Sequence, residues 1–491
     1  MAITQSQFIS WLSSNTAQRV VLVEAGVMTG GVEAVRYLSN AGYVTSPTDT
    51  PANTAYLPYV AGMGQFTEQL SLDGSPSISF GDLELFNASG ELDAWLFDVW
   101  SNRTVKVYLG DSTWTRGDFQ LIFAGVIDSI GSAQRNRLNL KVRDKLQLLN
   151  NPISEAVLGG TTSNAQRLIP LTFGEVHNVE PLLITPSSLT YQVHNSAIES
   201  VIEVRDNGVP VTVTQSLASG TFQLTASPVG QITVSVQGDK PSGAYSNTVG
   251  ALVQRIATGY GPAATRLTAA DFDTTAMTAF NTACPQPVGI YCSDRVNVLE
   301  ACQQLAASVG AQIITTPTGL IRLVQLGIPV SASDTLTTTD MLENTLQIGQ
   351  VCPVKAAVQL GYCKNWTVQT GLASGLSAAS TEMFTTEYLT INQSDSTVAA
   401  NYKLDAKPTE EDTLLLVTSD ATAEAARRLA LWKIQRMTLK VTCFANKLLA
   451  QLGAGITVTH SRYGLSAGKT GQIIGITRDW MAGRVTLEVL V

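Results

Sequence analysis

The chain has 491 residues, of which 44% are hydrophobic and only 14% are charged; 31 basic and 39 acidic side chains give a formal net charge of −8. Because an average globular protein carries about 25% charged residues, this surface is sparsely charged, which suits faces covered by neighbouring subunits. No run of Lys or Arg exceeds two residues, which argues against a surface that follows nucleic-acid phosphates or an anionic membrane. A single core rarely exceeds about 250–300 residues, so we expect three or four domains.

The N-terminus lacks the basic and apolar regions of a signal peptide, and no stretch reaches the roughly 18 apolar residues of a membrane span. We therefore expect folding in a cytoplasm, no membrane insertion and reduced cysteines. No CxxC pair is present, which excludes zinc-ribbon and thioredoxin-like sites. An iron–sulfur site built from Cys284, Cys292, Cys302 and one later cysteine stays open as an alternative.

The first predicted unit, residues 1–150, is dominated by strands. A helix is expected over 4–14, with Thr4 as N-cap and Phe8, Trp11 and Leu12 on one face. A second helix is expected over 91–100, from the helical spacing of Leu92, Trp95, Leu96 and Val99. The expected strands are 19–26, 77–86, 105–109, 119–130 and 138–142, and residues 39–64 are expected to form a loop.

The second and third predicted units differ in character. Residues 165–245 contain short strands at about ten-residue spacing, typical of a small β-barrel or sandwich. Asn207-Gly208 there predicts a tight hairpin turn. Residues 246–330 predict an α+β unit, with helices over 249–257 and 296–309, the latter capped by Ser293 or Asp294 and stopped by Gly310. A hairpin is expected from 311–315 and 320–326.

The fourth predicted unit, residues 331–491, carries the longest expected helix, 420–437, capped by Asp420. The face of this helix is expected to comprise Ala425, Ala426, Leu429, Ala430 and Met437. Residues 371–400 are expected to be loop. Strands are expected at 438–443, 455–459, 471–478 and 484–491. Because an unpaired apolar terminal strand invites aggregation, residues 485–491 are expected to be paired in a sheet.

No catalytic, cofactor or metal residue is predicted. Gly464 to Thr470 ends like a P-loop, but it has three residues between its glycines instead of four, and a strand follows it. The three histidines, His177, His194 and His460, form no HExxH motif, and no GxSxG marks a nucleophile. The carboxylates Asp82, Glu84, Asp93 and Asp98 read as solvated faces, and Trp95 and Trp100 as core. We therefore expect that the chain is not an enzyme.

A series of motifs runs along the chain in a fixed order. In the first two units they lie at 81–87, Trp95 to Trp100, 103–111, 123–127, 142–146, 169–174 and 191–194. In the last two units they are 298–305, 319–322, the long helix, Gly453, 468–475 and the terminal strand. In the order of these motifs, the chain resembles the baseplate hub or tail-tip hub proteins of long-tailed bacteriophages.

The resemblance implies two tail-tube-like β domains, 1–150 and 331–491, around the small β-barrel insert and the α+β domain. Three such chains would give a pseudo-sixfold ring, which docks on a sixfold tail tube and presents threefold symmetry to a central fibre. The implied role is a structural hub in the virion, assembled in the host cytoplasm. Its implied partners are two further copies, distal tail and tail tube proteins, central fibre or receptor-binding proteins, the tape measure protein and DNA in transit. An acidic lumen would keep that DNA from adhering to the wall.

Two other functions stay open from the sequence. A tail-associated cell-wall hydrolase would need two carboxylates across a cleft. A carbohydrate-binding receptor-recognition protein would need exposed rows of aromatic side chains, and only 7% of the residues are aromatic.

Overall fold

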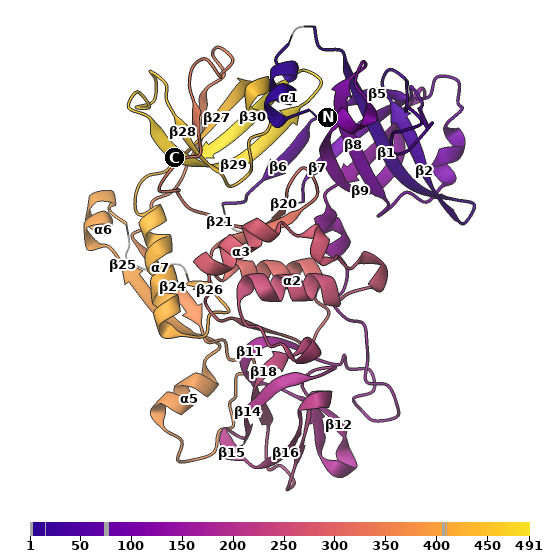
Figure 1. Cartoon of the computed structure of the whole chain (residues 1–491). Coiled ribbons are helices and arrows are strands. Elements are labelled where there is room, and N and C mark those ends of the chain that lie inside the picture. The colour runs from indigo at the N-terminus through magenta and orange to yellow at the C-terminus, as the bar shows by residue number, and fades with distance from the viewer. Residues whose placement is uncertain (1–2, 15, 73–77, 405–407, 409) are drawn as a thin grey trace.

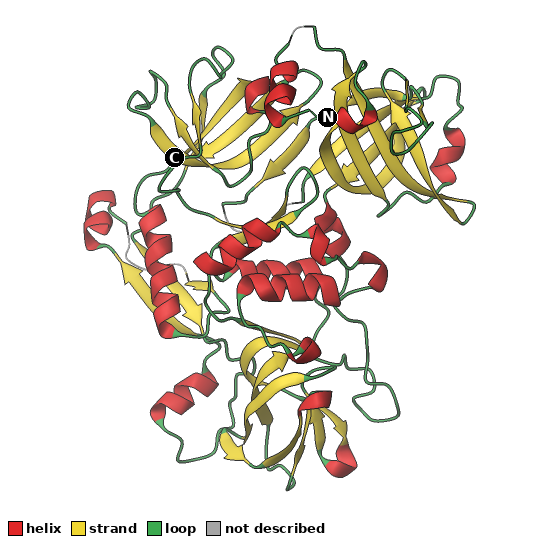
Figure 2. Ribbon diagram, in the orientation of Figure 1, coloured by secondary structure: helices red, strands yellow, loops and turns green. Residues whose placement is uncertain are grey.

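The computed structural model describes residues 3–14, 16–72, 78–404, 408 and 410–491. It is mainly β with α+β parts, as the sequence predicts. Figure 1 shows two β-rich parts side by side, one from each end of the chain, above a helical middle and a smaller β part. Figure 2 shows several helices in the middle, between the two upper β-rich parts and the smaller β part, and further helices at the periphery.

The N-terminal part comprises α1 (Gln5–Leu12), β1 (Arg19–Thr29), β2 (Val32–Ser39), β3 (Tyr43–Val44), β4 (Ala55–Tyr56), β5 (Val60–Met63), β6 (Phe66–Gln69), β7 (Phe80–Phe86), β8 (Thr104–Asp111), β9 (Gln120–Gln134) and β10 (Arg137–Arg143). Thr4 caps α1 through a reciprocal capping box with Gln7, as expected. Part of the expected loop 39–64 is instead β3, β4 and β5. Ser77, the first residue of one expected strand, lies outside the described residues.

The helix expected over 91–100 is wrong: only a 3₁₀-helix forms, Asp93–Phe97. Val99 exchanges two backbone hydrogen bonds with Met28 of β1, so the chain must be extended there. Leu96 and Val99 are consequently exposed, although Trp100 is buried and its ring lies 5.6 Å from that of Trp95. Pairing with a distant strand has overridden the helical spacing.

The smaller β part is a sandwich. Its strands are β11 (Leu171–Val179), β12 (Leu182–Thr185), β13 (Thr190–Gln192), β14 (Ile198–Asp206), β15 (Val209–Val211), β16 (Val213–Ser216), β17 (Thr221–Leu224) and β18 (Ile232–Asp239), with β19 (Gly289–Cys292) added from later in the chain. Asn207 and Gly208 both have positive φ and join β14 to β15, which confirms the predicted hairpin turn.

The helical middle comprises α2 (Val249–Gly259), α3 (Thr274–Ala283), α4 (Val298–Ala307), β20 (Ala311–Thr315) and β21 (Ile321–Gln325). The hairpin β20–β21 is confirmed. The expected cap of α4 is wrong, because the helix begins after Asn297 and lies within the predicted range.

Residues 331–491 divide between two places. A three-stranded sheet with its helices packs beside the middle: β24 (Ala357–Tyr362), α5 (Ala378–Thr385), β25 (Leu389–Ser394), α6 (Ser396–Tyr402), β26 (Glu410–Asp412) and α7 (Thr418–Trp432). The remainder joins the large sheet: β22 (Asp334–Leu336), β23 (Gln347–Val351), β27 (Met437–Phe444), β28 (Gly455–Val458), β29 (Lys469–Asp479) and β30 (Arg484–Leu490). The loop expected over 371–400 is wrong, since α5, β25 and most of α6 fall there.

The long helix α7 ends five residues before the predicted end, and Asp420 lies in its first turn without capping it. Met437 instead exchanges backbone hydrogen bonds with Val491, which requires an extended chain. Ala426 and Ala430 are exposed, so part of the expected buried face is also wrong. The prediction for the C-terminus is confirmed: β30 lies between β27 and β29, and Val485 to Val491 contribute to the core.

Candidate assembly interface

Two segments of the large sheet repeat one another. We name β7 to β10 the N-module and β27 to β30 the C-module. The strand order is β8-β9-β10-β7 in the N-module and β28-β29-β30-β27 in the C-module, and all three pairings in each are antiparallel. Each module is therefore a four-stranded unit in which the first strand returns beside the fourth.

The register of the two modules matches over residues 139–143 of β10 and 486–490 of β30, and only the N-module has a second shift, between Arg137 and Asn139. Leu140 of β10 lies opposite Leu83 and Ile130, and its counterpart Leu487 of β30 lies opposite Val441 and Ile476. A β-bulge interrupts the β9–β10 pairing at Asp128 and the β29–β30 pairing at the equivalent Ile474. A β-bulge bends its strand and is a specific feature of a fold. A bulge at the same position in both modules therefore indicates that they share one backbone arrangement.

A glycine marks the same place in both modules. Gly125 in β9 lies against the carbonyl oxygen of Arg143, and Gly471 in β29 lies against that of Leu490, its counterpart. A Cβ at either glycine would overlap that oxygen, so only glycine fits. The final strands also match in sequence, Arg137-Leu-Asn-Leu-Lys-Val and Arg484-Val-Thr-Leu-Glu-Val, a signal that sequence reasoning missed.

The modules are joined within the chain by β6. Gly475 to Arg478 of β29 pair antiparallel with Gln69 to Phe66 of β6, which also touches β7 at Phe80. Both side chains of the ion pair at this joint are buried: Arg478 Nη1 lies 2.8 Å from Glu68 Oε1, with side-chain exposures of 2% and 7%. The other guanidinium nitrogens of Arg478 donate to the carbonyl oxygens of Leu448 and Ala450. All three guanidinium nitrogens of Arg478 therefore have hydrogen-bond partners at this joint.

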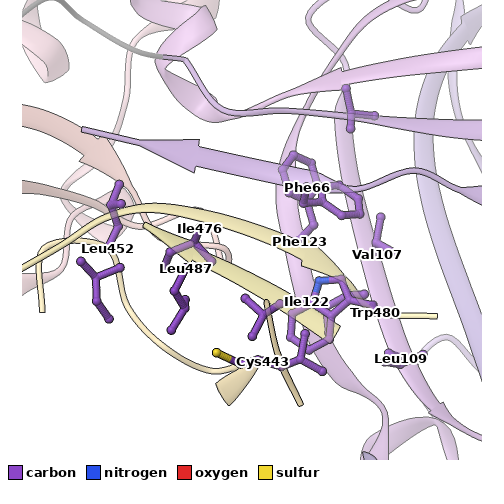
Figure 3. Close-up of a cluster of buried hydrophobic side chains, with 14 of the residues drawn as sticks. Phe66, Val107, Leu109, Ile122, Phe123, Cys443, Leu452, Ile476, Trp480 and Leu487 are labelled. Carbon is purple, nitrogen blue, oxygen red and sulfur yellow. The ribbon is translucent and has the colours of Figure 1, made fainter. Parts of the chain in front are cut away.

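One continuous core fills the joint. Phe66 of β6 lies 4.7 Å, ring to ring, from Phe123 of β9. Trp480, just past β29, is 2% exposed and belongs to the same buried cluster as Ile122 and Leu109 (Figure 3). Arg19 of β1 donates to the carbonyl oxygen of Met481 in the hairpin after β29. The two modules therefore do not form separate cores.

The ends of the large sheet differ in how far they are covered: Leu57 pairs with β2 at Leu38, whereas no described strand pairs with the outer edge of β23. The last strands of the sheet are β2 at one end and β23 at the other. All five residues of β23 are exposed, and none of them is charged. Exposed edge strands invite pairing with another chain, and proteins usually protect them with charges or proline. β23 lacks that protection, whereas β2 carries Glu33 and Arg36.

The histidines are separate from one another. His194 is fully buried: its Nδ1 accepts from the backbone N–H of Thr172, and its Nε2 lies 3.2 Å from Asp239 and from Tyr260 Oη. Arg255 also binds Asp239. Burial works against the charged form of Asp239, but the hydrogen bonds and charges of His194 and Arg255 hold its pKa at about 2. His177 pairs with Glu175, and His460 Nδ1 accepts from the N–H of Arg462.

The other sequence candidates have local partners. Asp82 binds Asn139, Glu84 pairs with Arg137, Asp93 accepts from Asn87 and Asp98 pairs with Arg36. Gly464 and Gly468 adopt positive φ in a loop that leads into β29, as expected for a loop before a strand.

The cysteines are all free, and five of the six are buried. Burial raises the pKa of Cys284 to about 11 and that of Cys292 to about 12, so both thiols are protonated at neutral pH. Over the described part of the chain, no three His, Cys, Asp or Glu side chains gather as a metal site would require. Within the same residues, no helix is both long and apolar enough to cross a membrane.

No family model and no curated protein matches the chain. Among solved structures it is similar to a tail protein from Neisseria meningitidis MC58, with 12% identity, 96% of this chain and 97% of that chain covered, and a TM-score of 0.38. It is similar to the 43 kDa tail protein of prophage MuSo2 from Shewanella oneidensis, with 10% identity, 96% and 98% covered, and a TM-score of 0.42. It is also similar to a chain of a native gene transfer agent virion, with 12% identity, 70% and 91% covered, and a TM-score of 0.44.

Proposed function

We propose that the chain is a structural hub of a bacteriophage-type tail tip or baseplate, in which three copies form a ring of six modules. The observation that carries this proposal is the repeat: the N-module and the C-module share strand order, register, bulge and glycine. A chain with two equivalent modules side by side is suited to matching a sixfold partner with three copies. Its residues between the modules occur once per chain and so would follow threefold symmetry.

In this function the six modules dock on the last ring of the tail tube, and the threefold surface receives a central fibre or receptor-binding proteins. The ring encloses a channel for the tape measure protein and later DNA. The low share of charged residues fits lateral faces that become covered, because few charges lose water on assembly. The net negative charge disfavours DNA adhering to the channel. The chain acts by assembly in the virion and carries out no chemistry.

The assembly state tests the proposal. The purified chain, alone and with its tail tube protein, is examined by light scattering after size exclusion and by electron microscopy of single particles. A trimer whose averages show six similar lobes around a threefold axis is expected. A monomer under both conditions, or a twofold particle, contradicts the hub.

The hydrolase alternative is tested with the same preparation on peptidoglycan. Release of soluble fragments, abolished by one carboxylate substitution, would establish that alternative. The hub proposal expects no release above buffer.

A further inference from the structure

The repeat shows that one strand edge is occupied in the C-module and open in the N-module. In the C-module, Gly475 to Arg478 of β29 are covered by β6. The shared register makes Ser129 to Gly131 of β9 the counterparts of Gly475 to Thr477, and Ser132 is the next residue along β9, before a second shift in the β9–β10 register. On that side of β9, the pairing with β8 ends at Val126, Ile127 bonds to Asn102 and Arg103, and Ser101 Oγ donates to the carbonyl oxygen of Asp128. From Ser129 onward, no described backbone group pairs with this side of β9. The N-module therefore presents a four-residue edge at the place where the C-module binds a strand.

This open edge has the chemistry of a strand acceptor. Its sequence is Ser129-Ile-Gly-Ser132, which has no charged side chain. A Cβ placed on Gly131 would meet nothing within 4 Å. Backbone N–H and C=O groups of such an edge are left to water unless another strand pairs with them.

The strand that fits this edge is β23. Within the chain, β5 pairs with β7 at Met63 and Leu83, and the chain continues directly into β6, which reaches β29. On the C-module, β23 pairs along the same side of β27, with Ile348 opposite Leu439 and Val351 opposite Met437. β23 thus holds the place of the β5–β6 segment, but its outer edge has no module beside it in this chain.

We propose that β23 of one copy adds as an antiparallel strand to Ser129–Ser132 of β9 in a second copy of this chain. The contact repeats between subunits the β6–β29 joint found within the subunit. This inference rests on the proposed ring of three copies and specifies which surfaces of neighbouring copies meet in that ring. Because the two surfaces differ, the contact is head-to-tail, and three such contacts close a ring if each adds a third of a turn.

Position-specific cross-linking tests the pairing. In the β6–β29 joint, Thr477 lies opposite Thr67. Gly131 is the counterpart of Thr477 in β9, and Gly349 or Gln350 is the counterpart of Thr67 in β23. A chain with Gly131→Cys and Gln350→Cys is expected to form covalent dimers and trimers under mild oxidation with diamide. Each single variant should stay monomeric on a non-reducing gel, as should Gly131→Cys combined with Val330→Cys, where Val330 is fully exposed outside both edges.

A second variant separates this proposal from the hub itself. Val351 is 52% exposed, so Val351→Lys should leave the fold and the thermal transition of the monomer unchanged. It should raise the concentration for half-assembly by about tenfold or more, because a charge at an edge opposes strand addition. Val330→Lys is the matched control and should assemble as the wild type does.

The outcomes are distinct. If the wild type forms the threefold ring while Val351→Lys assembles equally well and the cysteine pair gives no covalent oligomer, the ring exists but this contact is wrong. If the wild type forms no ring, both the proposed function and the contact fall.

Discussion

The N-module and the C-module are two copies of one frame, and the edge of their long strand, β9 or β29, is bound differently in each. In the C-module, β6 covers the edge of β29 and brings Glu68 to Arg478. In the N-module, Gly131 is the counterpart of Thr477, and Ser132 follows it in the chain as Arg478 follows Thr477, with no strand paired to this edge among the described residues. A buried ion pair is costly to separate, whereas an uncharged edge can take and release a strand. The same strand edge is therefore a permanent joint in the C-module and a surface suited to assembly in the N-module.

Breaking the ion pair at the joint should give the largest effect. Glu68→Ala leaves the guanidinium of Arg478 buried without its carboxylate, which should cost about 3–5 kcal/mol. The loss should appear as a lower urea midpoint and as faster hydrogen exchange in β6 and β29. Replacing both partners, with Glu68→Leu and Arg478→Met, should recover part of the loss because no charge is left unpaired.

The matched control is Glu33→Ala, which removes an exposed partner of Arg103. Such surface pairs contribute about 0–1 kcal/mol, so little change is expected. Equal effects of the two substitutions would contradict the distinction between a buried joint and an exposed edge.

The shared glycines test whether the modules are equivalent in energy as well as in shape. Gly125→Ala and Gly471→Ala each force a Cβ against a carbonyl oxygen, and overpacking of this kind costs about 1–3 kcal/mol. The two losses should agree within about 1 kcal/mol, since the obstructing oxygens are counterparts. Gly131→Ala, at the open edge, should be close to neutral in the same urea titration.

Low pH should destabilise the smaller β part, which contains Asp239, through protonation of that buried carboxylate. The pKa of Asp239 is held at about 2 in the fold, below its usual value of about 3.9. Its stabilisation is therefore present above about pH 4 and is lost as the pH falls toward 2. The effect should be about 2 kcal/mol, seen as earlier acid exposure of β18 than of β9 or β29 by hydrogen exchange. In Asp239→Asn this pH dependence should disappear, and a persisting acid transition would assign it to other carboxylates.

Much of the strand content could be predicted from local patterns, because alternation and turn residues act over short range. The turn at Asn207-Gly208, the hairpin β20–β21 and the terminal strand are examples. Two of the failures share one cause. Residues 91–100 and the end of α7 have helical spacing, but Val99 and Met437 pair with strands distant in sequence, and such pairing is invisible to a local pattern.

The assembly surface could not be predicted from the sequence, because it too depends on contacts between residues that are distant in the chain. Nothing local marks Glu68 and Arg478 as partners across 410 residues. The similar sequences of the two final strands, 137–142 and 484–489, indicate the repeat. Only the register of these strands with their neighbours shows which residues of the two modules correspond. Once Leu140 and Leu487 are matched, the open edge at Ser129–Ser132 follows.

The smallest effect on stability should come from copying the joint into the open edge. Ser132→Arg introduces an arginine near the place that Arg478 holds in the C-module, at an exposed position, so the monomer should change by about 0.5 kcal/mol or less. Ring formation should weaken several-fold, because β23 offers no carboxylate and the new charge would lose water on pairing. Adding Val351→Glu, near the position that corresponds to Glu68, should restore assembly and make it sensitive to salt. Val351→Glu alone should weaken the ring as Ser132→Arg does. If the double variant assembles no better than either single variant, the open edge and β23 do not meet, and the likeness of the two modules does not extend to how they bind strands.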